Sequence, residues 1–165
     1  MTLALIFALV LAELLFVGWT DFKTQKISNN WIAINFVVSI ILHFTFQTLY
    51  PLSWEVLIFP LGFILMGFFL YLFHVMGAGD SKFLASLFLI IPLEYHLVVF
   101  EKLVLSTVVT GSCLLTYRVI KNHHTLRVYL LSRYWDGIKQ TIKSRFSYAP
   151  VILVAWILFG FNLWK

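Results

Sequence analysis

Charged residues are scarce in this chain of 165 residues. Asp, Glu, Lys and Arg make up 12% of it, whereas 61% of its residues are hydrophobic and 18% are aromatic. A typical soluble domain contains about 25% charged residues, so this composition excludes an ordinary soluble domain. It predicts a polytopic membrane protein instead. Because one crossing needs about 20 apolar residues, the chain has room for six spans within a single domain.

Cysteine is scarcer still. Cys113 is the single cysteine and lies within an apolar run. One cysteine excludes an intramolecular disulfide and a CxxC zinc pair. The metalloprotease motif HExxH is also absent, which disfavours a zinc intramembrane protease. No internal repeat is evident, although transporters often carry one.

The apolar residues fall into six runs, at about 2–20, 31–49, 54–76, 83–96, 97–118 and 148–164. These runs predict an all-α membrane protein with about six transmembrane helices in one domain, residues 1–165. The first run has no Lys or Arg at its start and no small-residue cleavage site after it, so we expect a retained helix rather than a signal peptide. The 35 residues between Lys82 and Arg118 are too many for one crossing and few for two.

Basic residues indicate the orientation. Three connections hold 10 of the 12 Lys and Arg residues, namely Lys23, Lys26, Lys82, Arg118, Lys121, Arg127, Arg133, Lys139, Lys143 and Arg145. Basic connections are retained in the cytoplasm, which predicts that all three lie on that side and both termini outside. On this topology Asp21 and Asp80 both lie at the cytoplasmic boundary and can meet.

Residues 118–147 form the longest polar stretch, which we interpret as a basic cytoplasmic loop. Apolar residues recur in it every four positions, at Leu126, Leu130, Tyr134, Ile138 and Ile142. This spacing favours an amphipathic helix on the anionic inner leaflet of the lipid bilayer. The alternative is that its charges serve topology alone. Topology also accounts for the net charge of +5, so nucleic-acid binding is not predicted.

Asp21 and Asp80 are the residues that point to chemistry, because an ionisable group among lipid-embedded helices is a functional-site hypothesis by default. Two neighbouring carboxyl groups cannot both ionise easily, so one keeps a proton near neutral pH. The ionised group can then take a proton from water while the protonated group donates to a peptide carbonyl oxygen. This chemistry requires neither a metal ion nor another cofactor.

Two glycines precede the second acid, in the sequence Gly77-Ala78-Gly79-Asp80. We expect Gly77 and Gly79 to allow unusual backbone angles and a close approach between helices beside Asp80. The sequence leaves a simpler alternative open, in which Asp80 is the N-cap of the following helix.

Asp21 and Glu13 also have alternative interpretations that involve no catalysis. Asp21 can be an interfacial charge satisfied by water or by Lys23. Glu13, eight residues before Asp21, can be a third acid of the site or a polar contact between helices, and we favour the polar contact.

Both acidic segments resemble motifs of one family. Residues 21–29, Asp-Phe-Lys-Thr-Gln-Lys-Ile-Ser-Asn, resemble the motif around the first catalytic aspartate of type IV prepilin peptidases, which belong to the GxGD aspartyl proteases. Residues 77–82, Gly-Ala-Gly-Asp-Ser-Lys, resemble the Gly-x-Gly-Asp-x-Lys motif around the second. Residues 147–150, Ser-Tyr-Ala-Pro, resemble the aromatic and proline signature of the last helix. The resemblance covers the whole chain, and the two aspartates are 59 residues apart.

The resemblance implies a function and a set of site residues. Asp21 and Asp80 would be the catalytic pair, and Gly77, Gly79 and Lys82 would support Asp80. The substrate would be a type IV pilin or pseudopilin precursor, cut between its basic leader and its apolar helix. The protein would act at the cytoplasmic face of a bacterial or archaeal membrane, with the pilus assembly machinery as a further partner.

The sequence departs from the family pattern in two places. Ser28 stands where the family usually has proline, which bears on the conformation of that loop. The larger bifunctional members carry a cytoplasmic segment with paired CxxC motifs, linked to N-methylation of the mature pilin, and this chain has none. It resembles the compact, peptidase-only members that serve Flp/Tad-type pili, and no methyltransferase activity is expected.

Two non-enzymatic classes remain as alternatives. A small transporter or channel would also place acids near helix ends. A pilus-assembly subunit would explain the helices and leave the two aspartates without a role. A proteolysis assay with a pilin precursor separates both classes from the peptidase.

Overall fold

The computed structural model describes residues 2–24, 26–72, 76–132 and 148–163. Every regular element in these ranges is a helix. They are α1 (Thr2–Thr24), α2 (Asn29–Thr45), the 3-10 helix η1 (Trp54–Leu57), α3 (Ile58–Leu72), α4 (Ala78–Ile90), the 3-10 helix η2 (Leu93–Tyr95), α5 (His96–Lys121), α6 (His123–Leu131) and α8 (Ala149–Leu163). The predicted all-α class is confirmed.

Three helical segments are long and apolar enough to cross a membrane: Leu3–Thr24, Trp54–Leu72 and Leu93–Lys121. α2 and α8 are apolar but shorter, with 17 and 15 residues. α4 has 13 residues, and at 1.5 Å per residue it is about 20 Å long, less than the thickness of a bilayer core. The total of six spans therefore stays a prediction.

The predicted run at 83–96 is wrong at both of its ends. The helix begins at Ala78 and ends at Ile90, after which Ile91 has extended backbone angles. Pro92 follows and caps η2, which leads directly into α5. The helix ends here because a residue before proline is biased away from helical angles.

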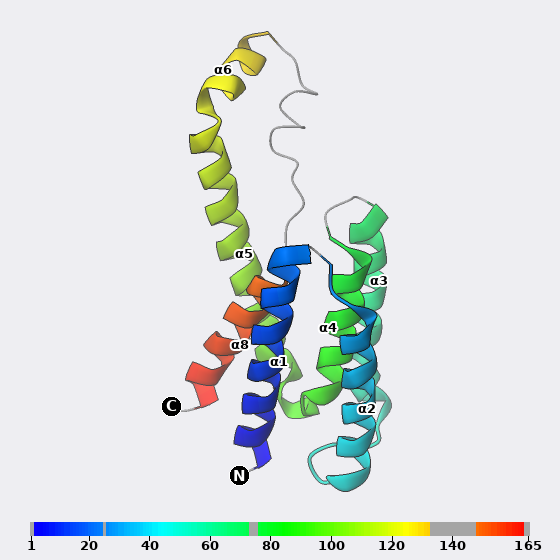
Figure 1. The fold of residues 1–165 in the computed structure, drawn as a ribbon. Coiled ribbons are helices and arrows are strands. Elements are labelled where there is room, and N and C mark those ends of the chain that lie inside the picture. The colour runs from blue at the N-terminus through cyan, green and yellow to red at the C-terminus, as the bar shows by residue number, and fades with distance from the viewer. Residues whose placement is uncertain (1, 25, 73–75, 133–147, 164–165) are drawn as a thin grey trace.

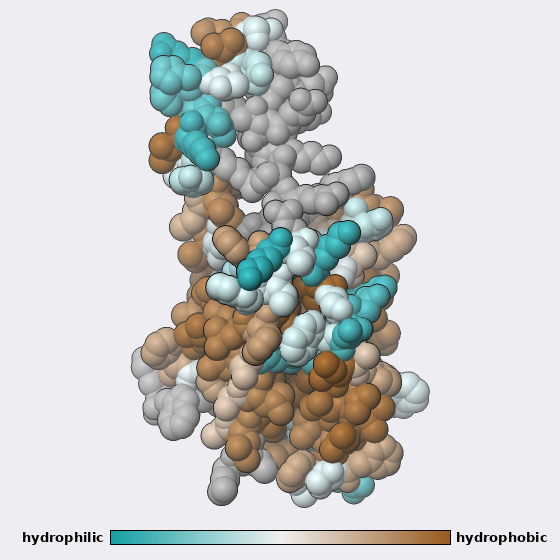
Figure 2. All heavy atoms as spheres, viewed as in Figure 1, coloured by the Kyte–Doolittle hydropathy of each residue, from teal (hydrophilic) through white to brown (hydrophobic). Residues whose placement is uncertain are grey.

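Large apolar side chains cover the outside of the protein. Trp54 is 87% exposed, Phe22 78% and Leu52 75%, and many Leu, Ile, Val and Phe residues are also exposed. Figure 2 shows this apolar surface over the body of the bundle, with hydrophilic residues gathered over α6 and where α1 ends. A soluble monomer rarely exposes so much apolar surface, which supports a membrane protein.

Six of the described helices pack as two groups of three (Figure 1). α4 packs against both α2 and α3, and α8 packs against both α1 and α5. Contacts between a helix of one group and a helix of the other are sparse among the described residues. We call α2, α3 and α4 the α4 half, and α1, α5 and α8 the α8 half. The boundary between them is the seam.

A glycine brings two helices of the α4 half together. A Cβ atom at Gly67 of α3 would overlap the side chain of Ser81 in α4. The absence of a side chain therefore lets α3 approach α4 closely at this level, as small residues do between membrane helices. Ser81, which directly follows Asp80, therefore lies close against α3.

The α8 half is joined mainly by aromatic side chains. The rings of Phe7 and Trp156 are stacked with centroids 5.4 Å apart, and the Trp156 Nε1–H donates to the carbonyl oxygen of Phe7 at 3.1 Å. The Ser106 hydroxyl donates to the carbonyl of Val151 at 2.8 Å. These contacts fix α8 between α1 and α5.

The helix ends that flank the two acids lie together, and the cytoplasmic orientation stays a prediction. Figure 1 shows that the end of α1 and the start of α4 lie at one end of the bundle. The connections from α2 to α3 and from α4 to α5 lie at the opposite end. α5 extends past the bundle to α6, whose Val128 and Leu131 are exposed. The rest of the predicted interfacial helix, residues 133–147, lies outside the described residues.

Candidate active site

The two predicted acids lie together at the seam. Asp21 lies near the end of α1 and is 2% exposed, and Asp80 lies in the first turn of α4 and is 9% exposed. They come from different halves, at the same end of the bundle. The Asp21 carboxylate acts electrostatically on Asp80 and raises its pKa. The structure thus brings together two residues that are far apart in the sequence.

The surroundings of Asp80 make its carboxyl easier to protonate. Burial raises its pKa most, a backbone hydrogen bond lowers it and the charge of Asp21 raises it, which together place the pKa at about 6. In that bond the backbone N–H of Gly77 donates to Oδ2 of Asp80 at 3.1 Å. A carboxyl group with a pKa of about 6 can hold and release a proton near neutral pH.

Gly77, not Asp80, is the N-cap of α4. Asp80 is the third residue of the helix, and its carboxylate accepts the N–H of the N-cap residue, as the acid of a capping box does. The alternative reading of Asp80 as the N-cap is therefore wrong. The helix dipole also stabilises a negative charge in the first turn, because the N-terminus of a helix carries a partial positive charge.

The two glycines act through space rather than through unusual backbone angles. Gly77 has φ −74° and ψ 145°, angles that any residue adopts, so the predicted special conformation is wrong there. A Cβ atom on Gly77 would lie 2.9 Å from Oδ2 of Asp80 and would displace the carboxylate. A Cβ atom on Gly79 would lie 3.4 Å from the carbonyl oxygen of Ile27, within ordinary contact.

The segment between α1 and α2 packs beside the start of α4. Ile27 is buried and lies against Gly79. Ser28 is the N-cap of α2, and its hydroxyl accepts from the N–H of Asn30 at 3.3 Å. The φ of Ser28 is −69°, close to the angle that a proline ring imposes. Serine at this position thus keeps the angle of the expected proline and adds a cap.

Lys82 is exposed. Among the described residues the ion pair joins Glu101 and Lys102 at 3.2 Å, and Lys82 makes none. The support that Lys82 is predicted to give Asp80 therefore stays a prediction.

Glu13 makes a polar contact across the seam. It is 8% exposed, and its carboxyl interacts with the side chain of Asn35 in α2. The Asn35 Nδ2–H donates to the hydroxyl of Ser86 in α4 at 3.2 Å. Glu13 is eight residues from Asp21 in the same helix, about 12 Å along its axis. The structure favours the polar contact between helices over a third acid of the site.

Tyr148 is the site residue that the sequence reasoning missed. It directly precedes α8, its hydroxyl is 2.7 Å from that of Thr107, and it interacts electrostatically with Asp80. Burial raises its pKa. Its position in the Ser-Tyr-Ala-Pro segment was a signal for the family but gave no role for the side chain.

The site brings two carboxyl groups together. Within the described ranges, no group of three His, Cys, Asp or Glu side chains could hold a metal ion. Asp21 and Asp80 supply two carboxyl groups at one place, and the raised pKa of Asp80 separates their roles. Such a pair can take a proton from water and deliver another to an oxygen atom.

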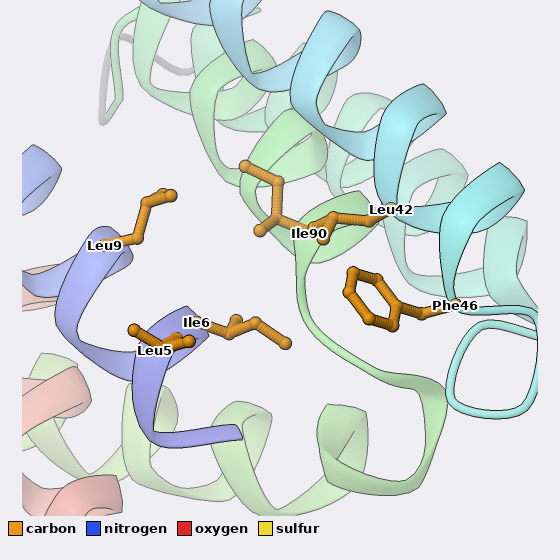
Figure 3. A pocket seen from close by; sticks show the side chains of 6 residues that line it. All are labelled: Leu5, Ile6, Leu9, Leu42, Phe46 and Ile90. Carbon is orange, nitrogen blue, oxygen red and sulfur yellow. The ribbon is translucent and has the colours of Figure 1, made fainter. Parts of the chain in front are cut away.

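Two cavities lie along the seam. One, of about 140 Å³, lies between the start of α1 and the ends of α2 and α4, far from the acids. Figure 3 shows the side chains that line it, Leu5, Ile6, Leu9, Leu42, Phe46 and Ile90. It is entirely apolar. The other, of about 380 Å³, includes Ser81 and Tyr148 in its lining and so lies beside Asp80.

The sequence model of the type IV leader peptidase family matches residues 7–164. No curated protein and no solved structure shows a significant match to the chain. The chain therefore belongs to the type IV leader peptidase family. Membership implies a peptidase and pilin precursors as its substrates.

Proposed function

We propose that this protein is a membrane-embedded aspartyl endopeptidase in which Asp21 and Asp80 activate a water molecule. It removes the basic leader of type IV pilin or pseudopilin precursors at the cytoplasmic face, and it has six transmembrane helices and no methyltransferase activity. One observation carries the proposal. Two buried acids from separate halves lie at the same end of the bundle and are electrostatically coupled.

The raised pKa of Asp80 assigns the roles. Protonated Asp80, the form that its raised pKa makes available near neutral pH, donates its proton to the scissile carbonyl oxygen, while Asp21 takes a proton from the attacking water. The oxygen of water bonds to the carbonyl carbon, and the tetrahedral intermediate then expels the amine. The amine leaves with the proton from Asp21. Asp80 recovers its own proton as the new carboxyl group forms, so no covalent enzyme intermediate is needed.

Gly77 is the positioning residue for this step. Its N–H binds Oδ2 of Asp80, which fixes the carboxyl plane at the helix start. Because it carries no Cβ atom, the carboxylate can occupy the space beside it. Orientation of a reacting group by its neighbours lowers the barrier, since a displacement of about 1 Å can cost on the order of 10²-fold in rate.

A cleavage assay tests the proposal. Purified protein in detergent is mixed with a pilin precursor, and leader removal is followed for the wild type, Asp21→Asn and Asp80→Asn. Because an amide cannot act as the base or share the proton, each variant should lose about 10²- to 10⁴-fold in rate. Glu94→Gln, the same change of chemistry at an exposed acid, should cleave normally. Near-normal cleavage by either aspartate variant would rule out the catalytic pair.

The orientation is tested by labelling single cysteines in a Cys113→Ser background. Ser28 and Lys82 are exposed near the acids, and Leu52 is exposed in the connection from α2 to α3. Cysteines at Ser28 and Lys82 should react with a membrane-impermeant reagent only after the cell is opened, whereas one at Leu52 should react in intact cells. Ser28 and Lys82 on opposite sides would contradict the proposed topology.

The same cleavage assay separates the peptidase from a transporter, a channel or a pilus-assembly subunit, because none of these would process a precursor. Family membership favours the peptidase.

A further inference from the structure

The helix α4 stops at the end of the bundle opposite the acids (Figure 1). Its last residue is Ile90, and Ile91 after it has extended backbone angles. The last four carbonyl groups of a helix have no partner within that helix, and a membrane offers no water to replace it. Pro92 follows and has no N–H to donate. The carbonyls at the end of α4 therefore need donors from other parts of the chain.

Three side chains donate to three consecutive carbonyls at this end of α4. We call them the far cap: Ser39, Tyr50 and His96. The Ser39 hydroxyl donates to the carbonyl of Leu89 at 3.1 Å, and the Tyr50 hydroxyl donates to that of Ile90 at 2.5 Å. Nε2 of His96 lies 2.9 Å from the carbonyl oxygen of Ile91. The donors come from α2, from the connection after α2 and from the first residue of α5.

The far cap is buried, and its acceptors determine where its hydrogen atoms lie. Tyr50 and His96 are each 1% exposed. Because a carbonyl oxygen can only accept, Nε2 of His96 carries the hydrogen. Nδ1 has no hydrogen-bond partner among the described residues, and the ring centroids of Phe59 and Phe88 lie 5.4 Å from that of the imidazole. A second proton would have no acceptor there, so His96 is neutral and its one N–H is given to the end of α4.

α2 turns a polar face toward α4. Its three buried residues, Asn35, Ser39 and His43, are all polar and are four positions apart, which places them on one side of the helix. Polar residues inside a membrane bundle are costly and are usually kept for a function. Asn35 donates to Ser86 of α4, and the His43 ring lies 5.0 Å from that of Tyr50. This face therefore carries one donor of the far cap and packs against a second.

The far cap fixes the depth of Asp80. Asp80 is ten residues before Ile90, which is about 15 Å along the axis of α4. Because a helix of this length moves as one body, a slip at the capped end moves the acid by the same amount. Donors from three different elements oppose both slip and rotation. The seam sets how close the two halves lie, whereas the far cap sets how far α4 carries Asp80 toward the acid end of the bundle.

Resting on the proposed function, we propose that Tyr50 and His96 are further positioning residues, which hold Asp80 at the depth of Asp21 from the opposite end of α4. They act through the helix and touch neither acid. A displacement of about 1 Å can cost on the order of 10²-fold in rate. Loss of one of the three bonds should therefore lower kcat by about tenfold and leave KM within about twofold.

The cleavage assay tests this role with variants that remove one donor each. Tyr50→Phe removes the hydroxyl alone, and His96→Leu removes the N–H. Each should lower kcat by about tenfold. His96→Gln should restore kcat, because an amide N–H can replace that of the imidazole. Tyr95→Phe is the matched control, since Tyr95 lies at the same end and its hydroxyl donates to no carbonyl of α4 among the described residues.

The depth of α4 is measured independently of activity. Spin labels are placed on cysteines at Phe44 in α2 and Lys82 in α4, both exposed, in the Cys113→Ser background. The distance between the labels should shift or broaden in Tyr50→Phe and His96→Leu. It should match that of the parent protein in Tyr95→Phe and His96→Gln.

The outcomes separate the positioning role from the proposed function. Folded Tyr50→Phe with the kcat of the wild type would overturn the role, even if its thermal stability falls. A lower kcat with an unchanged label distance would also overturn it. If His96→Leu is poorly folded, Tyr50→Phe decides the question. Wild-type protein that cleaves no precursor would contradict the proposed function, and the label distances would still decide whether the far cap sets the depth of α4.

Discussion

The two halves of the protein each supply one acid, but from opposite ends of a helix. In the α4 half, Asp80 lies in the first turn of α4, where its Oδ2 accepts the N–H of Gly77 at 3.1 Å. In the α8 half, Asp21 lies near the end of α1. Both halves are joined by hydrogen bonds and by rings, of which Phe59 is stacked on Phe88 in the α4 half and Phe7 on Trp156 in the α8 half. The start of α4 therefore orients the carboxyl of Asp80 through the backbone of its own helix.

The seam has fewer contacts than either half. Its polar connection is that between Glu13 and Asn35, and at the end with the acids Ile27 lies on Gly79. Because Asp21 and Asp80 stand on opposite sides of the seam, their separation depends on these contacts rather than on the core of either half. The separation of the two acids is therefore set where contacts between the described helices are fewest.

Among changes that leave both acids in place, the largest predicted effect comes from Gly77→Ala, which disturbs Asp80 within its own half. The added Cβ atom would lie 2.9 Å from Oδ2 and must displace the carboxylate. We expect a loss on the order of 10²-fold in kcat with little change in thermal stability. Gly79→Ala, whose Cβ atom makes ordinary contact with Ile27, should lose much less, and Gly111→Ala should lose nothing. Equal activity of all three variants would contradict the positioning role of Gly77.

Replacing Asp80 by Asn should raise the stability of the folded protein at neutral pH although it lowers activity. The pKa of Asp80 is about 6 when folded and near 3.8 when unfolded, so the folded state binds the proton more tightly. Its contribution is complete below about pH 4 and is lost as the pH rises to about 6, on the order of 3 kcal/mol in total. Asp80→Asn should therefore be more stable than the wild type at pH 7, and this advantage should disappear below about pH 4. Thermal unfolding of both proteins across this range measures it.

The pH dependence of cleavage should report the same carboxyl. Because the mechanism needs Asp80 protonated in the free enzyme, kcat/KM should fall about tenfold per pH unit above the pKa of Asp80, about 6. A profile that stays flat from pH 6 to pH 9 would exclude Asp80 as the proton donor.

The smallest predicted effect is that of Glu13→Gln at the seam. Glutamine can keep the polar contact with Asn35, so cleavage should survive. Stability should change by about 0.6 kcal/mol or less, the average for a polar contact between membrane helices. A loss of activity as large as that of Asp21→Asn would mean that Glu13 belongs to the catalytic group.

The sequence predicted that the two acids lie close together but did not predict their surroundings. The motifs at 21–29 and 77–82 and the charge pattern predicted that Asp21 and Asp80 meet, because both depend on local sequence and topology. Hydrophobic runs show that a helix exists, but they contain no information on which helices pack together. The two halves, the seam and the closeness of Gly67 to Ser81 were therefore not predictable from the runs.

Small local preferences also decided details that motifs leave open. The N-cap is Gly77 rather than Asp80. Asp80 is the third residue of the helix, and from there its carboxylate can accept the N–H of the N-cap residue. Tyr148 was missed because an aromatic residue at a helix start is common near membranes and its contact with Asp80 depends on how α8 is placed.

Titration of Asp80 in the presence and absence of the Asp21 charge is the most direct test that the two halves bring their acids together. The carboxyl C=O stretch of Asp80 is followed by infrared spectroscopy, assigned by its loss in Asp80→Asn, in the wild type and in Asp21→Asn. Because Asp21 raises the pKa of Asp80 through its charge, the midpoint should be lower in Asp21→Asn and unchanged in the control Glu94→Gln. A midpoint that is the same in Asp21→Asn and in the wild type would contradict an acid pair across the seam.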